Sequence, residues 1–398
     1  MTQDETAALA VPDAVLDQVR RGVRSVLVDT AALRTVRERF DEQQVGSLRG
    51  YLEASQSPNT LRAYRTDWIA WAAWCSAEGR QALPADPVDV AVYLAAAADA
   101  RRENGEFAFG PATLERKSAA IAAVHAANGL PAPTRADVVR LTLRGIRRTR
   151  RSRPTRKRPV LLHTLGQLLD QLPAPGPGAE AARRRDTLLL LVGFAGALRR
   201  SELAGLRVDD VAVQTDHRTG EPLLLVRLAG TKTDPTGVHE QRVVLPRGQR
   251  PHTCPVCAFA DWLQLREIHV AEGDSGIRRA PAVDNALHRC HGYTGSALAG
   301  RDLPLFPTVN RHGGLGATAM SGRAVAELVK RYAARAGLDP ALFSGHSLRA
   351  GFATQAALGG AADREIMRQG RWSNPRTVHR YIRTADPLDD NAVTKLGL

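Results

Sequence analysis

Residues 147–159 constrain the fold of this 398-residue chain more than any other segment. Eight of these thirteen residues are Lys or Arg and two are proline, so the segment lacks the apolar side chains that a core requires. We therefore expect two folding units joined by a basic linker. The predicted organisation is a partly ordered acidic leader at 1–44, a helical domain at 45–146, the linker at 147–159 and a larger domain at 160–398.

The charge balance indicates a polyanionic partner. The chain has 55 basic and 41 acidic residues, a formal net charge of +14, and clustered Lys and Arg gain free energy by releasing counterions from phosphates. The longest apolar run, Thr187–Leu198, is shorter than the roughly 20 residues that span a membrane and indicates a buried helix. The first residues are acidic, unlike the basic start of a secretory signal. We expect a cytoplasmic protein that binds nucleic acid and no membrane.

Helical signals fill the segment before the linker. From Leu61 to Cys75 the apolar residues recur at three- and four-residue intervals, which predicts one buried helix face. Asp86 can cap a second helix whose first residue is Pro87. Two more helices are predicted, one from Gly110-Pro111 to Asn128-Gly129 and one from near Thr134.

The larger domain is predicted to be mostly helical with one β interruption. Pro222–Leu228 and Gln241–Pro246 read as strands around a polar turn, Thr231–Gly237, that carries Lys232. The predicted fold class is therefore mainly α, with an all-helical first domain and a small β-hairpin or sheet in the second.

Two short motifs place reactive side chains three residues apart. Arg199 and Glu202 share a face of a predicted helix, where a carboxylate can hold a guanidinium in place, although most such pairs are ordinary surface ion pairs. His346 and Arg349 also share a predicted helix face. An arginine can fork onto phosphate oxygens while an imidazole moves a proton, so this pair suits a phosphodiester.

A third motif lies near the end of the sequence. Asn374 can cap a helix that starts at Pro375, which places Tyr381 near the end of the second helical turn, shortly after Trp372. An aromatic residue in such a position is most often a core anchor. A chemical role for Tyr381 therefore depends on the other motifs.

The ordered set of these residues resembles the active site of the tyrosine recombinase (phage integrase) family, and within it of the Cre-like recombinases. The set is Arg199, Glu202, Lys232, His346, Arg349, Trp372 and Tyr381. The likeness covers about residues 57–398 and extends to five short segments. These are Trp71–Cys75, Pro84–Pro87, Gly230–Thr233, Ser344–Ser347 and Tyr381–Arg383.

The resemblance implies a covalent mechanism without ATP, metal or other cofactor. Tyr381 would attack the scissile phosphate, giving a 3′-phosphotyrosyl bond and a free 5′-hydroxyl. Arg199 and Arg349 would clamp the non-bridging oxygens, and Lys232 would protonate the leaving 5′-oxygen.

Three further residues have supporting roles in this interpretation. His346 would assist proton transfer at the tyrosine. Trp372 would offer its indole N–H to the phosphate, or only pack the floor of the site. Glu202 would support Arg199 and its helix.

The resemblance also implies partners: double-stranded DNA with paired inverted-repeat sites, and self-assembly as a dimer on each site and a tetramer in the synapse. The helical domain would be the core-binding domain, closing with the catalytic domain around the duplex. The acidic leader does not look like an arm-binding module, which favours a simple recombinase. Candidate phosphate contacts are Arg62, Arg65, Arg116, Lys117 and Arg147.

Three other functions remain open at this stage. A type IB topoisomerase would use similar chemistry but act as a monomer that lets one strand swivel, and the Cre-like helical domain argues against it. A DNA-binding relative without catalysis would have a broken active-site set, whereas this set is complete. An integrase or transposase of a mobile element would differ from a resolvase only in its DNA sites.

The segment from His252 to Arg301 is longer than in Cre-like relatives and contains a possible metal cluster. Cys254 and Cys257, followed about 30 residues later by His288, Cys290 and His291, have the spacing of paired zinc ligands. In the family, however, Cys-Pro-Val looks like a helix start that needs no metal. We therefore expect no resident zinc.

Overall fold

The computed structural model divides the chain into two units, Met1–Pro154 and Thr155–Leu398. It describes residues 41–54, 58–150, 157–176, 178–228, 241–283, 286–382, 393 and 396. The division falls within residues 147–159. The last helix of the first unit continues to Thr149, beyond the boundary at 146 that the sequence suggests. The leader, 1–44, lies almost wholly outside the described residues.

Helices and 3₁₀ turns are the regular elements among the described residues of the first unit, apart from an isolated bridge between Arg101 and Phe107. Asp86 caps α5 through its side chain, which accepts from the Val88 N–H at 2.7 Å, as predicted. The helices are α3 (Glu42–Ala54), α4 (Pro58–Ala77), α5 (Pro87–Asp99), α6 (Pro111–Ala127) and α7 (Asp137–Thr149), with a 3₁₀ turn η2 (Pro133–Arg135).

Aromatic side chains form much of the core of this unit. Trp71 is fully buried and stacks on Trp74, with ring centroids 5.6 Å apart, while its Nε1 donates to the Ala82 carbonyl. Tyr93 from α5 packs edge-on against Trp71 at 5.2 Å. The apolar face predicted from Leu61 to Cys75 is therefore the face that α4 buries against its neighbours.

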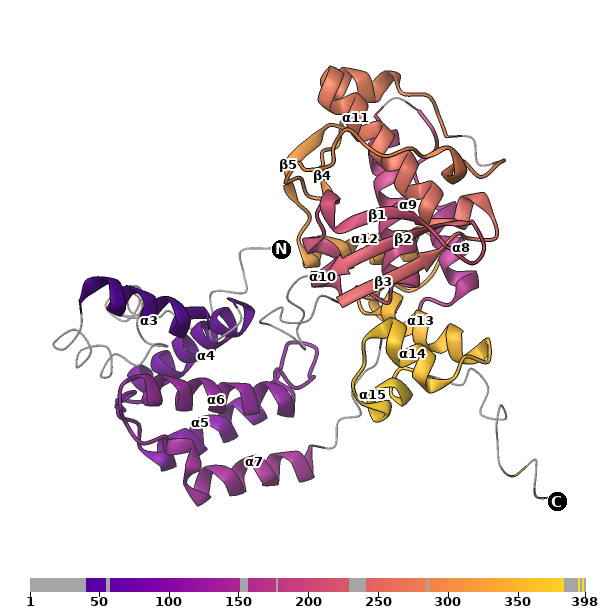
Figure 1. Ribbon diagram of the computed structural model, residues 1–398. Helices are drawn as coiled ribbons and strands as arrows, with labels where there is room; N and C mark the ends of the chain where they lie inside the picture. Colours follow the sequence, from indigo (N-terminus) through magenta and orange to yellow (C-terminus); the bar gives the residue numbers. More distant parts are fainter. Residues whose placement is uncertain are drawn as a thin grey trace. The chain divides into compact units, whose positions relative to one another are not determined.

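The second unit is mixed, with helices around two small sheets (Figure 1). Its helices are α8 (Leu162–Asp170), α9 (Glu180–Ala195), α10 (Arg200–Gly205), α11 (Pro255–Arg279), α12 (Gly322–Arg335), α13 (Ser347–Leu358), α14 (Asp363–Gly370) and α15 (Pro375–His379). Short 3₁₀ turns are η3 (Val208–Asp210), η4 (Pro251–Thr253), η5 (Cys290–Gly292) and η6 (Pro340–Leu342). The predicted fold class, mainly α with a small sheet, is confirmed.

The main sheet is antiparallel in the order β1 (Val211–Thr215), β2 (Pro222–Leu228), β3 (Gln241–Pro246). Strands β2 and β3 have the predicted bounds, and their pairing runs from Leu223 with Pro246 to Leu228 with Gln241. Residues 229–240, which include Lys232, lie outside the described residues. Strand β1 and the second sheet, of β4 (Pro307–Val309) and β5 (Leu315–Ala319), were not expected from the sequence.

Helix α9 is the centre of the second core. Residues Leu188–Val192 are buried, as the apolar run predicted. At its start the fully buried Asp186 accepts from the Tyr332 hydroxyl of α12 at 2.6 Å and from Arg185 Nε at 2.8 Å. This network ties α9 to α12 and satisfies a carboxylate that would be costly to bury alone.

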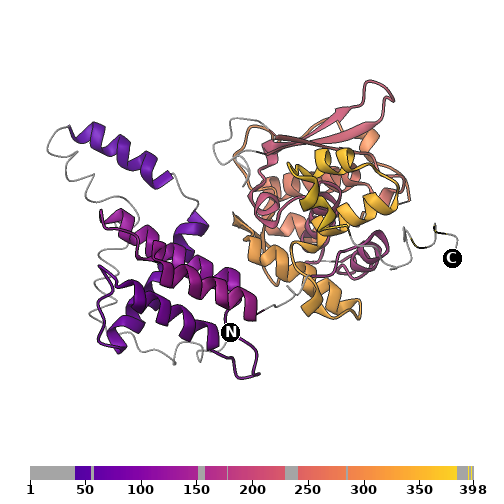
Figure 2. The ribbon, with the colours of Figure 1, turned by 90° about the horizontal axis from the view of Figure 1, so that it is seen from below.

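Helices α13, α14 and α15 gather at one end of the second unit, drawn in yellow in both ribbon views (Figures 1 and 2). Helix α13 lies tight against the chain entering the unit, because a Cβ on Gly351 would approach the Val160 carbonyl oxygen to 1.8 Å. The Val160 N–H donates to Ser347 O at 2.9 Å. No helix within the described ranges combines the length and apolar character needed to cross a membrane.

Candidate active site

The turn between α9 and α10 positions the first motif. Ala197 has a positive φ of 47°, and Arg199 follows as the N-cap of α10. The Arg199 N–H donates to Glu202 Oε2 at 2.9 Å, and its guanidinium pairs with the same carboxylate. The expectation that both residues sit on one helix is therefore corrected: Arg199 lies one residue before the helix, and Glu202 closes a capping box.

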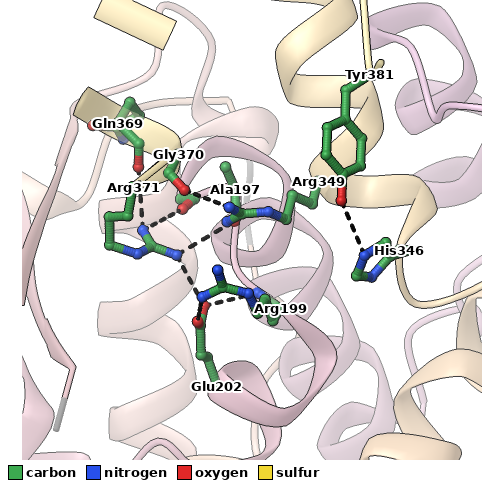
Figure 3. Close-up of polar contacts among 10 residues, drawn as sticks. Ala197, Arg199, Glu202, His346, Arg349, Gln369, Gly370, Arg371 and Tyr381 are labelled. Carbon is green, nitrogen blue, oxygen red and sulfur yellow. Dashed lines mark hydrogen bonds and ion pairs between the residues drawn. The ribbon is translucent and has the colours of Figure 1, made fainter. Parts of the chain in front are cut away.

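A second arginine, which the sequence analysis did not assign, shares Glu202. Arg371 Nη2 donates to Glu202 Oε2 at 2.9 Å, and its side chain is 6% exposed. Arg371 Nη1 donates to the carbonyls of Gly196 at 3.2 Å and Gln369 at 3.1 Å. Glu202 therefore supports more than Arg199, joining the start of α10 to the segment after α14 (Figure 3).

Arg371 follows α14 in a left-handed conformation, with φ 56°. That position after a helix usually holds glycine, because a Cβ there costs conformational energy. Within the described residues, Arg371 and Ala197 are the two residues other than glycine with positive φ. The signal available in the sequence was a charged residue between Gly370 and Trp372.

Arg349 is the most deeply buried arginine of the cluster, with 1% of its surface exposed. Its guanidinium donates to the carbonyls of Ala197 and, at 2.5 Å, Gly370, and its Cζ lies 4.1 Å from the centre of the Trp372 ring. A Cβ on Gly370 would collide with that ring at 1.8 Å, so glycine is required for the ring to lie there. Trp372 therefore packs directly on Arg349.

The electrostatics of this cluster leave an excess of positive charge. Burial, followed by repulsion from Arg199 and Arg371, lowers the pKa of Arg349 from its usual 12.5 to about 9. Burial alone would raise the pKa of Glu202, but Arg371 and the hydrogen bonds from Arg199 outweigh it, and the pKa is lowered. Two guanidiniums thus pair with Glu202 while the third, of Arg349, has no carboxylate partner in the cluster, an arrangement suited to a bound anion.

His346 and Tyr381 meet at the edge of this cluster. The Tyr381 hydroxyl lies 3.2 Å from His346 Nε2, and the two side chains point toward one another (Figure 3). His346 is the exposed N-cap of α13, while Arg349 in its first turn points inward. The expectation that His346 and Arg349 share a helical face is therefore corrected, since one faces the tyrosine and the other the arginine cluster.

Tyr381 lies two residues after α15, which ends at His379, and not within its second turn as expected. The Thr354 hydroxyl from α13 donates to the Tyr381 carbonyl at 2.8 Å. The ring packs 5.3 Å from that of Trp372. These contacts fix the tyrosine backbone while its half-buried ring keeps the hydroxyl beside His346.

The predicted DNA contacts in the first unit differ in exposure. Arg62, Arg65, Arg116 and Arg147 are exposed, although Arg116 also pairs with Asp67 at 3.2 Å and Arg147 with Glu115 at 3.4 Å. Lys117 is 5% exposed and lies 3.7 Å from Asp67 and 3.2 Å from the Tyr93 hydroxyl. Lys117 is therefore a core residue, and its assignment as a phosphate contact is wrong.

The cysteine-rich segment folds into one cluster. Cys254, Cys257, His288 and Cys290 bring their ligand atoms within 4.8 Å of one another. His291, predicted with them, is instead exposed and lies 3.4 Å from Glu221. His291 is therefore excluded from the cluster.

Comparisons with known proteins identify the family. The model described as "Phage integrase family" matches residues 275–387. An integrase/recombinase xerD homolog from Selenomonas ruminantium is 31% identical over 348 residues, which are 87% of this chain and 87% of that protein. The chain belongs to the phage integrase family of tyrosine recombinases.

Two further comparisons concern a distant relative in sequence and a solved structure of similar fold. Recombinase Cre from Escherichia phage P1 is 27% identical over 326 residues, 80% of this chain and 81% of Cre, so the likeness to Cre is distant. A crystal structure of the XerH site-specific recombinase bound to palindromic difH substrate, a post-cleavage complex, is similar in fold. Its TM-score is 0.54 at 13% identity, covering 98% of both chains. Family and fold support site-specific DNA recombination.

Proposed function

We propose that this recombinase cleaves and rejoins duplex DNA at specific sites through a covalent 3′-phosphotyrosyl bond to Tyr381. The observation that carries the proposal is the Tyr381 hydroxyl, which lies 3.2 Å from His346 at the edge of the cluster of Arg199, Arg349 and Arg371. A phenol next to a proton acceptor and an anion site has what attack on a phosphodiester requires.

The reaction is a balanced exchange of phosphate esters. The Tyr381 oxygen bonds to phosphorus as its proton passes toward His346, and the bond from phosphorus to the 5′-oxygen breaks. Lys232, outside the described residues, gives the departing oxygen its proton. A 5′-hydroxyl of the partner DNA then attacks the phosphotyrosyl bond, which reverses these steps and releases Tyr381. The reaction therefore requires neither ATP nor a metal ion.

The arginine cluster supplies the charge that stabilises the transition state. Arg199 is 16% exposed at its side chain and has the accessible guanidinium, whereas Arg349 already donates to two carbonyls. The lowered pKa of Arg349 means that burial and the neighbouring arginines disfavour its positive charge. A phosphate bound there would offset the repulsion, most strongly when the pentacoordinate state gains charge.

The proposed substrate is double-stranded DNA with paired inverted repeats, bound by one dimer per site and a tetramer in the synapse. The XerH site-specific recombinase bound to a palindromic difH substrate supports an inverted-repeat site as the substrate. Residues 45–146 are proposed as the core-binding domain and 160–398 as the catalytic domain, joined by 147–159. Arg62, Arg65, Arg116 and Arg147 remain proposed phosphate contacts because they are exposed.

The test begins with duplexes selected by this protein from a randomised pool. Tyr381→Phe removes one oxygen and keeps the ring on Trp372, so it should bind the selected duplex normally and form no covalent adduct. Tyr293→Phe, a matched control in the same unit, should form the adduct at the normal rate. Mass spectrometry of the digested adduct should place the DNA on Tyr381, and a different residue would overturn the proposal.

The role of Lys232 is tested with a sulfur-substituted substrate. Lys232→Ala should cleave ordinary DNA about 100-fold or more slowly. A thiolate needs no proton to depart, so replacing the leaving 5′-oxygen with sulfur should restore most of that rate. The Tyr381→Phe defect should persist on the same substrate. A Lys232→Ala defect that sulfur does not relieve would count against this acid, and relaxation of supercoiled DNA without strand exchange would favour the topoisomerase function.

A further inference from the structure

Four soft ligand atoms converge in the second unit, away from the arginine cluster. Cys254 is the N-cap of α11, Cys257 lies in its first turn, and His288 and Cys290 come from the segment that follows α11. The three cysteines are 0–5% exposed. His288 Nδ1 lies 3.4 Å from Cys257 Sγ and 3.9 Å from Cys290 Sγ.

These separations suit a single tetrahedral ion. Zinc bonds to cysteine sulfur at about 2.3 Å, so the ligands of a tetrahedral zinc lie about 3.8 Å from one another. The four atoms here all fall within 4.8 Å, and two of the separations bracket that value. A set of three thiolates and one imidazole favours zinc over the hard cations, which prefer oxygen.

The surroundings of Cys254 provide the hydrogen bonds that a metal-bound thiolate accepts. Its Sγ accepts from the backbone N–H groups of Gly248 at 3.3 Å and Cys257 at 3.5 Å. A Cβ on Gly248 would approach the Cys254 Cα to 2.8 Å, so glycine permits this close approach. The helix start expected from the sequence and a metal ligand are therefore compatible roles for Cys254.

The imidazole is also oriented from outside the cluster. His288 Nε2 lies 3.4 Å from the Gln249 carbonyl oxygen. With the proton on Nε2, that nitrogen points toward an acceptor and leaves the Nδ1 lone pair directed at the sulfur atoms. Metal-bound histidines are commonly held in this way by a carbonyl on the far nitrogen.

We propose that Cys254, Cys257, His288 through Nδ1, and Cys290 bind one structural Zn²⁺ ion. Binding displaces one proton from each thiol, without any change of oxidation state. All four coordination positions are filled by protein atoms, so the ion has no open position for catalysis. This proposal departs from our sequence-based expectation of no resident zinc, because the folded chain brings four of the five candidate ligands together.

The ion would join two segments directly, and a third contacts the ligands through hydrogen bonds. Gly248 and Gln249 follow β3, Cys254 and Cys257 begin α11, and Cys290 lies in the η5 turn. Helix α11 packs against α9, and β3 follows the residues that contain Lys232. Zinc would therefore stabilise the part of the catalytic domain in which β3, α11 and η5 meet.

The experiment measures zinc in the full-length protein, purified without added metal or a metal-affinity tag. Elemental analysis should find about one zinc per chain after dialysis. Paired Cys257→Ser and Cys290→Ser substitutions should reduce this at least tenfold. His291→Ala, one residue beyond a ligand, and Cys75→Ser, the remaining cysteine, should each keep a full equivalent.

A second measurement protects the test against variants that do not fold. Cobalt replacing zinc in the wild-type chain should give the intense visible bands of a tetrahedral, thiolate-bound ion. His288→Cys should retain metal with a shifted cobalt spectrum, because a fourth thiolate replaces the imidazole. Wild-type protein that holds no zinc and gives no tetrahedral cobalt spectrum would overturn the proposal. A mass two hydrogens lower, showing a disulfide in the cluster, would do so as well. Neither result bears on Tyr381 chemistry.

Discussion

Both units bury a carboxylate between basic side chains, but with opposite balance. Asp67 in the first unit is 2% exposed and contacts Lys117 and the partly exposed Arg116. Burial raises the pKa of Asp67 and lowers that of Lys117, so desolvation outweighs their attraction. Around Glu202 the attraction of the arginines outweighs burial.

The difference distinguishes a charge cluster that stabilises packing from one whose charge is suited to a bound anion. At Asp67 one buried cation faces one buried anion, and the pair serves the packing of α4, α5 and α6. At Glu202 the guanidiniums outnumber the carboxylate, and Arg349 has no carboxylate of its own. Uncompensated buried charge is unfavourable unless a ligand completes it.

The largest expected effect is on stability, in the first unit. Asp67→Ala leaves Lys117 buried without a carboxylate and should lower the free energy of unfolding by about 3–5 kcal/mol. Urea unfolding followed by tryptophan fluorescence measures this, because Trp68, Trp71 and Trp74 report on that unit. Replacing both partners, Asp67→Leu with Lys117→Met, should recover much of the loss. A loss of unfolding free energy below about 1 kcal/mol in Asp67→Ala alone would contradict the proposed difference between the two charge clusters.

The next effect is on rate, in the second unit. Arg199→Ala should slow formation of the covalent adduct by about 100–1000-fold, since preorganised charge at the phosphate is worth roughly 2.7–4 kcal/mol. Unfolding should change far less than in Asp67→Ala. Arg200→Ala, the exposed neighbour, is the matched control and should cleave normally. Equal rates for the two variants would show that the Glu202 cluster is structural too.

The smallest effect concerns pH. The folded pKa of Glu202 lies below its unfolded value of about 4.5, so its ionised form stabilises the protein above that pH. This contribution is lost as the pH falls through the folded pKa. Glu202→Gln should cost on the order of 1 kcal/mol at neutral pH, and the gap to wild type should close on acidification. Thermal unfolding across acidic pH measures the gap, and a constant gap would refute the ionic role.

The sequence predicted those features that depend on neighbours in the chain. Asp86 with Pro87 predicted the start of α5, and two apolar stretches that flank a polar turn predicted the bounds of β2 and β3. The family motifs predicted the residues that meet at the site, including the contact between His346 and Tyr381.

The sequence could not predict features that depend on distant partners. Arg371 owes its role to a carboxylate 169 residues away and to a left-handed backbone. Lys117 is buried because Asp67, fifty residues earlier in the chain, lies opposite it. His291 follows Cys290 directly but faces Glu221, since side-chain direction within a turn is set by the folded backbone.

The positive φ angles of Ala197 and Arg371 set a limit on engineering this protein. Glycine at either position would relieve backbone strain of about 1 kcal/mol or more. Arg371→Gly would relieve this strain but would also remove the buried guanidinium that pairs with Glu202 and donates to the carbonyls of Gly196 and Gln369, and losing that pairing costs more than the strain. A screen for heat resistance should therefore keep the strained arginine at 371, whereas glycine at 197 discards only one methyl group.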